Sequence, residues 1–209
     1  MDLALLLCEM DPAWCDRVGF ERLLTTDVEV GIAQSPRHGA PMTLIRAGEE
    51  RDLAAIAAMG EIRAAPFRFY LDRDVDLVRY AITKKRLLAG FGSSGSRQLH
   101  FFIAEEGITA AAYAVVSVEG SSWTIEECGD RDPSGARVGA ILQGLIAREP
   151  IERRPVIRGW LPPRFVPPQV TILSRQPSAK VVMVRALGSA TTQLPLTADD
   201  VLLWHDDVD

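Results

Sequence analysis

Two adjacent carboxylates beside a turn of small residues are the first candidates for chemistry. Glu126 and Glu127 lie in a largely apolar stretch, residues 123–128, that is typical of a strand. A positioned carboxylate can act as a general base. Because neighbouring strand residues face opposite sides of a sheet, only one of the two is expected to point into a cleft. The alternative is a pair of solvated or salt-bridged acids at a sheet edge.

The turn after this strand has the composition of an anion site. Its small and basic residues are Arg131, Ser134, Gly135, Ala136 and Arg137. A helix is expected to begin at Pro133 and Ser134. The free N–H groups and the dipole at a helix N-terminus bind phosphate where small residues let it approach. Asp130 and Asp132 count against tight anion binding, and the alternative is an ordinary proline-led helix start capped by Ser134.

Metal and disulfide chemistry are not predicted. The cysteines are odd in number, widely spaced and without a CxxC pair, which favours a reducing compartment; they are Cys8, Cys15 and Cys128. The histidines lie too far apart in sequence to predict a metal cluster; they are His38, His100 and His205.

Composition places the chain among globular proteins. Its 209 residues are 47% hydrophobic and 24% charged, which is enough apolar material for a buried core. With 23 basic and 28 acidic residues the net charge is -5, so no basic surface for nucleic acid is expected. The apolar run at 3–7 is too short for a signal sequence or a membrane span, so the chain is expected to be cytoplasmic and without a membrane partner.

The hydrophobic periodicity predicts strands and helices in a mixed order. Strands are expected over residues 3–8, 20–32, 42–46, 99–104, 108–118, 123–128, 156–161 and 181–187. Helices are expected over 12–18, 49–59, 72–89 and 133–149. Tight connections at 106–107 and 119–121 predict an antiparallel meander of the three central strands. Residues 90–96 are expected to form a mobile Gly/Ser-rich loop, and the proline-rich stretch after 161 an irregular segment.

This order, with a small-residue turn opening the long helix after the third meander strand, resembles the GNAT acetyltransferase fold. The implied fold class is α/β (α+β), with a mixed, mainly antiparallel sheet flanked by helices. In that family the turn carries Gln/Arg-x-x-Gly-x-Gly/Ala and binds the pyrophosphate of acetyl-CoA, the co-substrate. The resemblance implies that Glu126 or Glu127 is the general base, and that cofactor binding falls to Arg131, Ser134, Gly135, Ala136 and Arg137. Ser134 departs from the expected glycine, and its side chain could crowd the phosphate.

A second match lies near the start of the chain. Residues 15–20, from Cys15 to Gly19 and Phe20, are similar to the Tyr-x-x-x-Gly-Phe frame of the strand–helix–strand that closes many GNAT domains. In the family the tyrosine commonly protonates the departing thiolate of coenzyme A. Cys15 stands in its place, so the resemblance makes it a candidate catalytic acid; a small packed residue is the alternative.

The two matches occur in the reverse of the family's order, which implies two domains. Residues 1–41 are interpreted as the C-terminal fragment of a first GNAT domain, 42–187 as a GNAT-like domain and 188–209 as a tail. The chain thus resembles part of a tandem, Eis-like GNAT protein, and this plan leaves open whether Met1 is the native start. The strand at 3–8 must then pair elsewhere in the fold or with a second chain.

The implied function is transfer of an acetyl group from acetyl-CoA to a small-molecule or peptide amine, by a protein that is possibly degenerate or truncated. The implied partners are that amine and a second copy of the chain, with no metal. A non-catalytic GNAT-like module that mediates dimerisation is the alternative. A third possibility, an unrelated small-molecule binding domain, would be favoured if the meander closed into a barrel.

Overall fold

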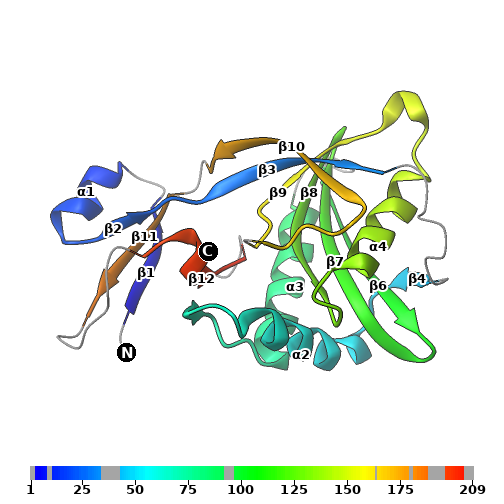
Figure 1. Ribbon diagram of the computed structural model, residues 1–209, viewed down its shortest axis with the longest axis horizontal. Helices are drawn as coiled ribbons and strands as arrows, with labels where there is room; N and C mark the ends of the chain where they lie inside the picture. The colour runs from blue at the N-terminus through cyan, green and yellow to red at the C-terminus, as the bar shows by residue number, and fades with distance from the viewer. Residues whose placement is uncertain are drawn as a thin grey trace.

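The computed structural model describes residues 3–8, 11–33, 43–91, 97–162, 164–178, 181–187 and 196–204. Its main feature is an open seven-stranded sheet with the order β10-β3-β9-β8-β7-β6-β4 (Figure 1). A three-stranded sheet, β1-β11-β2, and a short pair, β12-β5, lie beside it. Since β10 and β4 end the main sheet, the meander does not close into a barrel, and the third possibility loses the observation that would have favoured it.

The element order agrees with the prediction except for three strands that were not predicted, β5, β10 and β12. The strands are β1 (Leu3–Cys8), β2 (Glu21–Leu23), β3 (Thr26–Ile32), β4 (Leu44–Ala47), β5 (Phe69–Tyr70), β6 (Gln98–Glu106), β7 (Thr109–Glu119), β8 (Ser122–Asp130), β9 (Val156–Gly159), β10 (Val170–Pro177), β11 (Val181–Ala186) and β12 (Val201–Leu202). The helices are α1 (Pro12–Arg17), α2 (Leu53–Ala64), α3 (Val75–Gly90) and α4 (Ala136–Ile146), with short 3₁₀ turns at Glu50–Asp52, Ile151–Arg153 and Ala198–Asp200.

The central meander is confirmed. β6, β7 and β8 pair antiparallel in sequence order. Gly107 and Gly120 take positive φ angles of 65° and 58° in the two connecting turns, a conformation that glycine adopts without a steric penalty. The predicted loop at 90–96 lies largely outside the described residues, as does most of the predicted tail.

Each face of the sheet is covered by its own helices. On β7, Ala112, Ala114 and Val116 belong to the buried cluster that includes α4. The intervening Tyr113 and Val115 belong to the cluster formed with α2 and α3. This period-two division is the strand alternation expected for a sheet buried on both faces. β8 therefore lies between two different helical layers, and its side chains reach one or the other.

The three N-terminal strands pair with strands from the second half of the chain. β3 lies between β9 and β10, whereas β1 and β2 pair with the two edges of β11. The predicted strand at 20–32 is two strands, β2 and β3, in different sheets. Strands on both sides of the expected boundary at residue 41 therefore belong to the same sheets. The origin of residues 1–41 in a first domain stays a prediction.

β8 and β9 form the one parallel pair of the main sheet, and they pair over a short length. Ser122–Ile125 of β8 is aligned with Val156–Gly159 of β9, and β8 then continues to Asp130 without β9. A Cβ atom on Gly159 would lie 2.8 Å from the carbonyl oxygen of Ile125. The strands are in close contact at this glycine, and they separate beyond it.

Replacing Gly159 with alanine tests this close approach. Its methyl group would meet the backbone of β8, which cannot move without disturbing the sheet, so Gly159→Ala is expected to lower the free energy of unfolding by about 1–3 kcal/mol. Gly60→Ala is the matched control because nothing lies within 4 Å of its Cβ position in α2; it is expected to stabilise by about 0.5–1 kcal/mol. Urea unfolding measures both, and equal stability of the two variants would contradict the contact.

Candidate functional site

A β-bulge in β8 sets the directions of the two adjacent carboxylates. Glu127 is aligned with Val115 of β7 and Ile125 with Val116, so Glu126 is the extra residue. Such a bulge breaks the strict alternation of a strand. The expectation that Glu126 and Glu127 face opposite sides is therefore wrong: both reach groups on the side of α2 and α3.

Glu127 is held by a cation and a phenol. Its Oε1 atom lies 2.7 Å from Nη1 of Arg73, and the same oxygen accepts a hydrogen bond from the Tyr113 hydroxyl. Both of these contacts are made to one carboxylate oxygen, Oε1. Burial, and secondarily the charge of Glu127, raise the pKa of Tyr113 well above its ordinary value. The phenol therefore stays protonated and remains a donor.

Glu126 is engaged by different groups. It accepts a hydrogen bond from the Ser117 hydroxyl, and its carboxylate lies 3.8 Å from Nζ of Lys85 and 3.6 Å from Nη2 of Arg97. The side chains of Glu126 and Lys85 are each 7% exposed. Glu126 thus anchors α3 and the start of β6 to β8, which is a structural role.

Glu127 lines a cavity of about 300 Å³ between α2, the segment before α3 and the C-terminal turn. Apolar and small residues form most of the wall: Ile56, Ala57, Ala58, Gly60, Ala64, Tyr70, Leu71, Val75, Val78, Leu202 and Trp204. Its charged residues are Glu61, Asp72, Asp74 and Glu127, against Arg73 alone. Four carboxylates against one guanidinium leave a formal charge of −3, which favours a cationic ligand over an anionic one.

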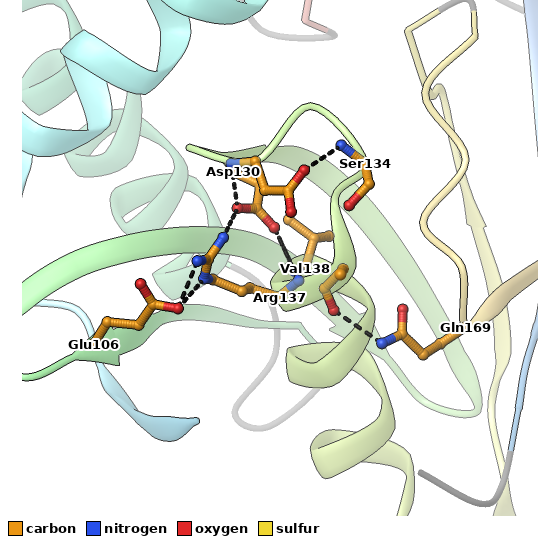
Figure 2. A network of polar contacts seen from close by, with 8 residues as sticks. Glu106, Asp130, Ser134, Arg137, Val138 and Gln169 are labelled. Atoms are coloured by element: carbon orange, nitrogen blue, oxygen red, sulfur yellow. Dashed lines mark hydrogen bonds and ion pairs between the residues drawn. The ribbon is translucent and has the colours of Figure 1, made fainter. Parts of the chain in front are cut away.

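The turn at the start of α4 is already occupied by the chain's own carboxylate (Figure 2). Asp130 Oδ2 accepts hydrogen bonds from the amides of Arg137 at 2.9 Å and Val138 at 3.4 Å. Its Oδ1 accepts from the amide of Asp132 and from Nη1 of Arg137, at 2.8 and 3.0 Å. The same arginine also contacts Glu106. The amide of Ser134 donates to Asp132 instead.

Side chains also pack closely around the turn at the start of α4. A Cβ atom on Gly135, at a φ angle of 70°, would lie 2.5 Å from the ring of Phe165, and the Arg63 guanidinium stacks on that ring at 3.6 Å from its centroid. Burial lowers the pKa of Arg63. Phe165 and Cys128, each 1% exposed, belong to one buried cluster with Trp160 and Trp204.

These contacts do not fit acetyl-CoA, the coenzyme that the resemblance predicted for this turn. The residues named for it, Arg131, Ser134, Gly135, Ala136 and Arg137, do come together at the start of α4. The amides of Arg137 and Val138 are taken by Asp130, however, and the guanidinium of Arg137 by Asp130 and Glu106. Phe165 lies against Gly135 and belongs to the buried cluster that includes Cys128 of β8. A diphosphate would have to displace Asp130 and Glu106 to reach the donors that they hold.

Cys15 is not brought to this site. It lies on α1, at the opposite end of the molecule from α4 (Figure 1). Its Sγ atom is 3.4 Å from Sγ of Cys8, and this hydrogen bond is the main cause of a raised pKa of the Cys15 thiol. The strand, helix and glycine that frame it do form as predicted, with Gly19 at a φ angle of 83°. The local frame of the second match is present, but Cys15 lies remote from Glu127.

Other site types find no support in the part of the chain that the structure describes. No group of three His, Cys, Asp or Glu side chains there could hold a metal ion. Within the same residues, no helix is long and apolar enough to span a membrane.

Comparisons with known proteins identify the fold. No protein-family model and no curated protein sequence matches the chain. Solved structures do. The GCN5-related N-acetyltransferase of Kribbella flavida is 14% identical with a TM-score of 0.55, and the match covers 90% of this chain and 43% of that one. A conserved Enterococcus faecalis protein, described as a probable N-acyltransferase, is 13% identical with a TM-score of 0.54, covering 88% and 44%.

A third structure, the GCN5-related N-acetyltransferase of Anabaena variabilis, is 12% identical with a TM-score of 0.50 and covers 88% of this chain and 45% of that one. The chain thus spans less than half the length of each of these proteins. At such identities the likeness concerns the fold. The chain has the GNAT fold, and its mixed, mainly antiparallel sheet flanked by helices is confirmed.

Several residues of the site were not found by sequence reasoning. Arg73 and Tyr113 carry no local pattern that links them to Glu127, because they meet it only in the folded sheet. Asp130 was noted as an obstacle to anion binding, but its capping role was not predicted. The bulge did leave a signal: the apolar spacing changes from two residues, Trp123 to Ile125, to three, Ile125 to Cys128.

The closure beside β8 predicts how Cys128 reacts. Burial raises the pKa of its thiol to about 12, so the thiolate fraction at pH 8 is on the order of one in ten thousand and rises only about tenfold at pH 9. Iodoacetamide at pH 8 is therefore expected to leave Cys128 unmodified in the folded protein and to modify it in urea, as peptide mass spectrometry would measure. Rapid labelling of Cys128 in the folded chain would mean that the gap is open.

Proposed function

We propose that this chain is a GNAT-fold domain that binds a cationic amine in the cavity at Glu127. One observation carries the proposal: Glu127 is a nearly buried carboxylate, its side chain 3% exposed, in the wall of a cavity with an excess of acids. Buried carboxylates are costly unless their oxygens are paired. Oε1 is paired with Arg73 and Tyr113, and the proposal assigns Oε2 to the ligand.

The charges around the cavity support an ammonium group over a neutral one. Arg73 balances Glu127, so the pair alone is neutral. Glu61 and Asp72 are exposed at the rim and add negative potential at the entrance. Asp74 is used in part to cap α3, where it accepts a hydrogen bond from the amide of Leu77 at 2.8 Å. An ammonium group that donates to Oε2 would be attracted by the rim and paired within the cavity.

The apolar wall limits the rest of the ligand. Tyr70, Leu71, Leu202 and Trp204 surround the polar groups, and the cavity volume of about 300 Å³ is at the small end for ligand pockets. The ligand class is therefore a primary amine on a short apolar or aromatic body. A lysine side chain of a peptide and a small arylalkylamine both meet this description.

A second candidate function is transfer of an acetyl group from acetyl-CoA to that amine. The fold and the position of Glu127, on the part of β8 that β9 no longer accompanies, favour it, because a carboxylate beside an ammonium group can take its proton. The filled turn and Phe165 oppose it. Incubation of the protein, acetyl-CoA and an amine followed by mass spectrometry distinguishes the candidates: binding without an acetylated product is expected.

A role as a self-associating module remains a further proposal. β1 is paired with β11 within the chain, so the strand at 3–8 does not require a second copy to complete a sheet. Light scattering measures the oligomeric state directly.

The amine proposal is tested by calorimetry with phenethylamine and its neutral counterpart 2-phenylethanol. Phenethylamine is expected to bind and the alcohol to bind weakly or not at all. Glu127→Gln removes the charge at Oε2, and its affinity for phenethylamine is expected to fall about 10- to 100-fold, the usual effect of losing a charge-assisted hydrogen bond.

Glu126→Gln is the matched control. It makes the same change on the adjacent residue, whose carboxylate contacts Ser117, Lys85 and Arg97 outside the cavity wall. Its affinity is expected to stay within about twofold of the wild type, and thermal melts of both variants establish that they are folded. Equal binding of the amine and the alcohol, or an unchanged affinity of Glu127→Gln, would refute the proposal.

A further inference from the structure

We infer that Asp130 is a built-in anion: its carboxylate takes the place of a phosphate at the start of α4, so that this turn is closed to coenzyme A. The inference concerns the α4 side of β8. It is independent of the amine proposal, which concerns the α2 and α3 side.

The contacts of Asp130 are those that a helix start offers to a phosphate group. Two consecutive amides at the start of α4, those of Arg137 and Val138, donate to one oxygen. A turn amide and the guanidinium of Arg137 donate to the other. Free amides at a helix N-terminus together with an arginine are a common way to hold an anion. The side chain of Asp130 is 0% exposed, so the occupant is fully enclosed.

The guanidinium of Arg137 is already paired with carboxylates of the chain itself. Arg137 is shared between Asp130 and Glu106, with the nearest atoms 3.0 and 2.5 Å apart. Asp132 adds a third carboxylate, and its oxygen accepts from the amide of Ser134. A hydrogen bond from that amide is the main cause of the lowered pKa of Asp132, so this group is ionised at neutral pH. A diphosphate would have to approach the carboxylates of Glu106, Asp130 and Asp132.

The space around the turn is taken as well. Phe165 and Pro167 lie against Gly135, where an added Cβ atom would be 2.5 and 3.3 Å from their rings. Gln169 donates a hydrogen bond of 2.9 Å to the carbonyl of Ala136 in the first turn of α4 (Figure 2). The segment 165–169 thus covers the turn on the side away from Arg137. Charge and shape exclude the same ligand for separate reasons.

Removing the carboxylate of Asp130 is expected to create a site for a small external anion. In Asp130→Ala the amides of Arg137 and Val138 and the guanidinium of Arg137 lose their main acceptor, which is expected to lower the melting temperature by about 5–10 °C. Acetate replaces the missing group and binds only the folded state, so it is expected to raise the melting temperature of this variant in a saturable way.

The experiment compares melting temperatures in sodium acetate and sodium chloride at constant ionic strength. The wild type is expected to show no difference between the two salts. Asp132→Ala is the matched control, because its carboxylate lies on the same turn but contacts the Ser134 amide at the surface; it is expected to show no acetate rescue. Absence of rescue in Asp130→Ala, or an equal rescue in Asp132→Ala, overturns the inference.

A measurement on the wild type keeps the inference testable if Asp130→Ala does not fold. Calorimetry with coenzyme A, and separately with inorganic pyrophosphate, is expected to give no binding heat. Saturable binding of either ligand to the wild type overturns the inference. Because phenethylamine binding is measured on the other side of β8, failure of the amine proposal leaves this result unaffected.

Discussion

The extra residue in β8, Glu126, determines which side of the sheet Glu126 and Glu127 face. Trp123 and Ile125 belong to the cluster packed on α4, so an unbroken alternation would turn Glu127 into that apolar cluster. The bulge at Glu126 resets the alternation: Cys128 returns to the α4 side, and Glu126 and Glu127 reach the α2 and α3 side. One carboxylate is then used to anchor α3, and the other is left in the wall of a cavity.

The two sides of β8 differ in how they are occupied. On the α2 and α3 side, a cavity with a buried carboxylate and acidic rim is present. On the α4 side, Asp130 accepts hydrogen bonds from the start of the helix and Phe165 packs against Gly135. Asp130 thus makes the hydrogen bonds that an external anion would otherwise make.

The spacing of apolar and turn residues predicted those parts of the fold that depend on neighbouring residues. The meander and α4 follow from periodicity and glycine turns, but α4 begins at Ala136, with Gly135 at its N-cap, and not at Pro133 and Ser134 as predicted. β10 was missed because prolines precede it and its partner, β3, lies at the other end of the chain. The ion pair of Arg73 with Glu127 and the stacking of Arg63 on Phe165 join distant segments, so no spacing in the sequence reports them. Asp130 was noted in the sequence, but its role in capping α4 depends on the folded conformation of the turn.

The ion pair of Arg73 and Glu127 is nearly buried, and burying two charged groups is costly. Replacing such a pair with apolar residues of similar volume is often neutral or stabilising, so stability alone is a weak explanation for it. Tyr113 adds a second donor to the same oxygen, which helps to fix the carboxylate in one orientation. Under the amine proposal, these contacts hold one oxygen of Glu127 in place while the other receives the cation.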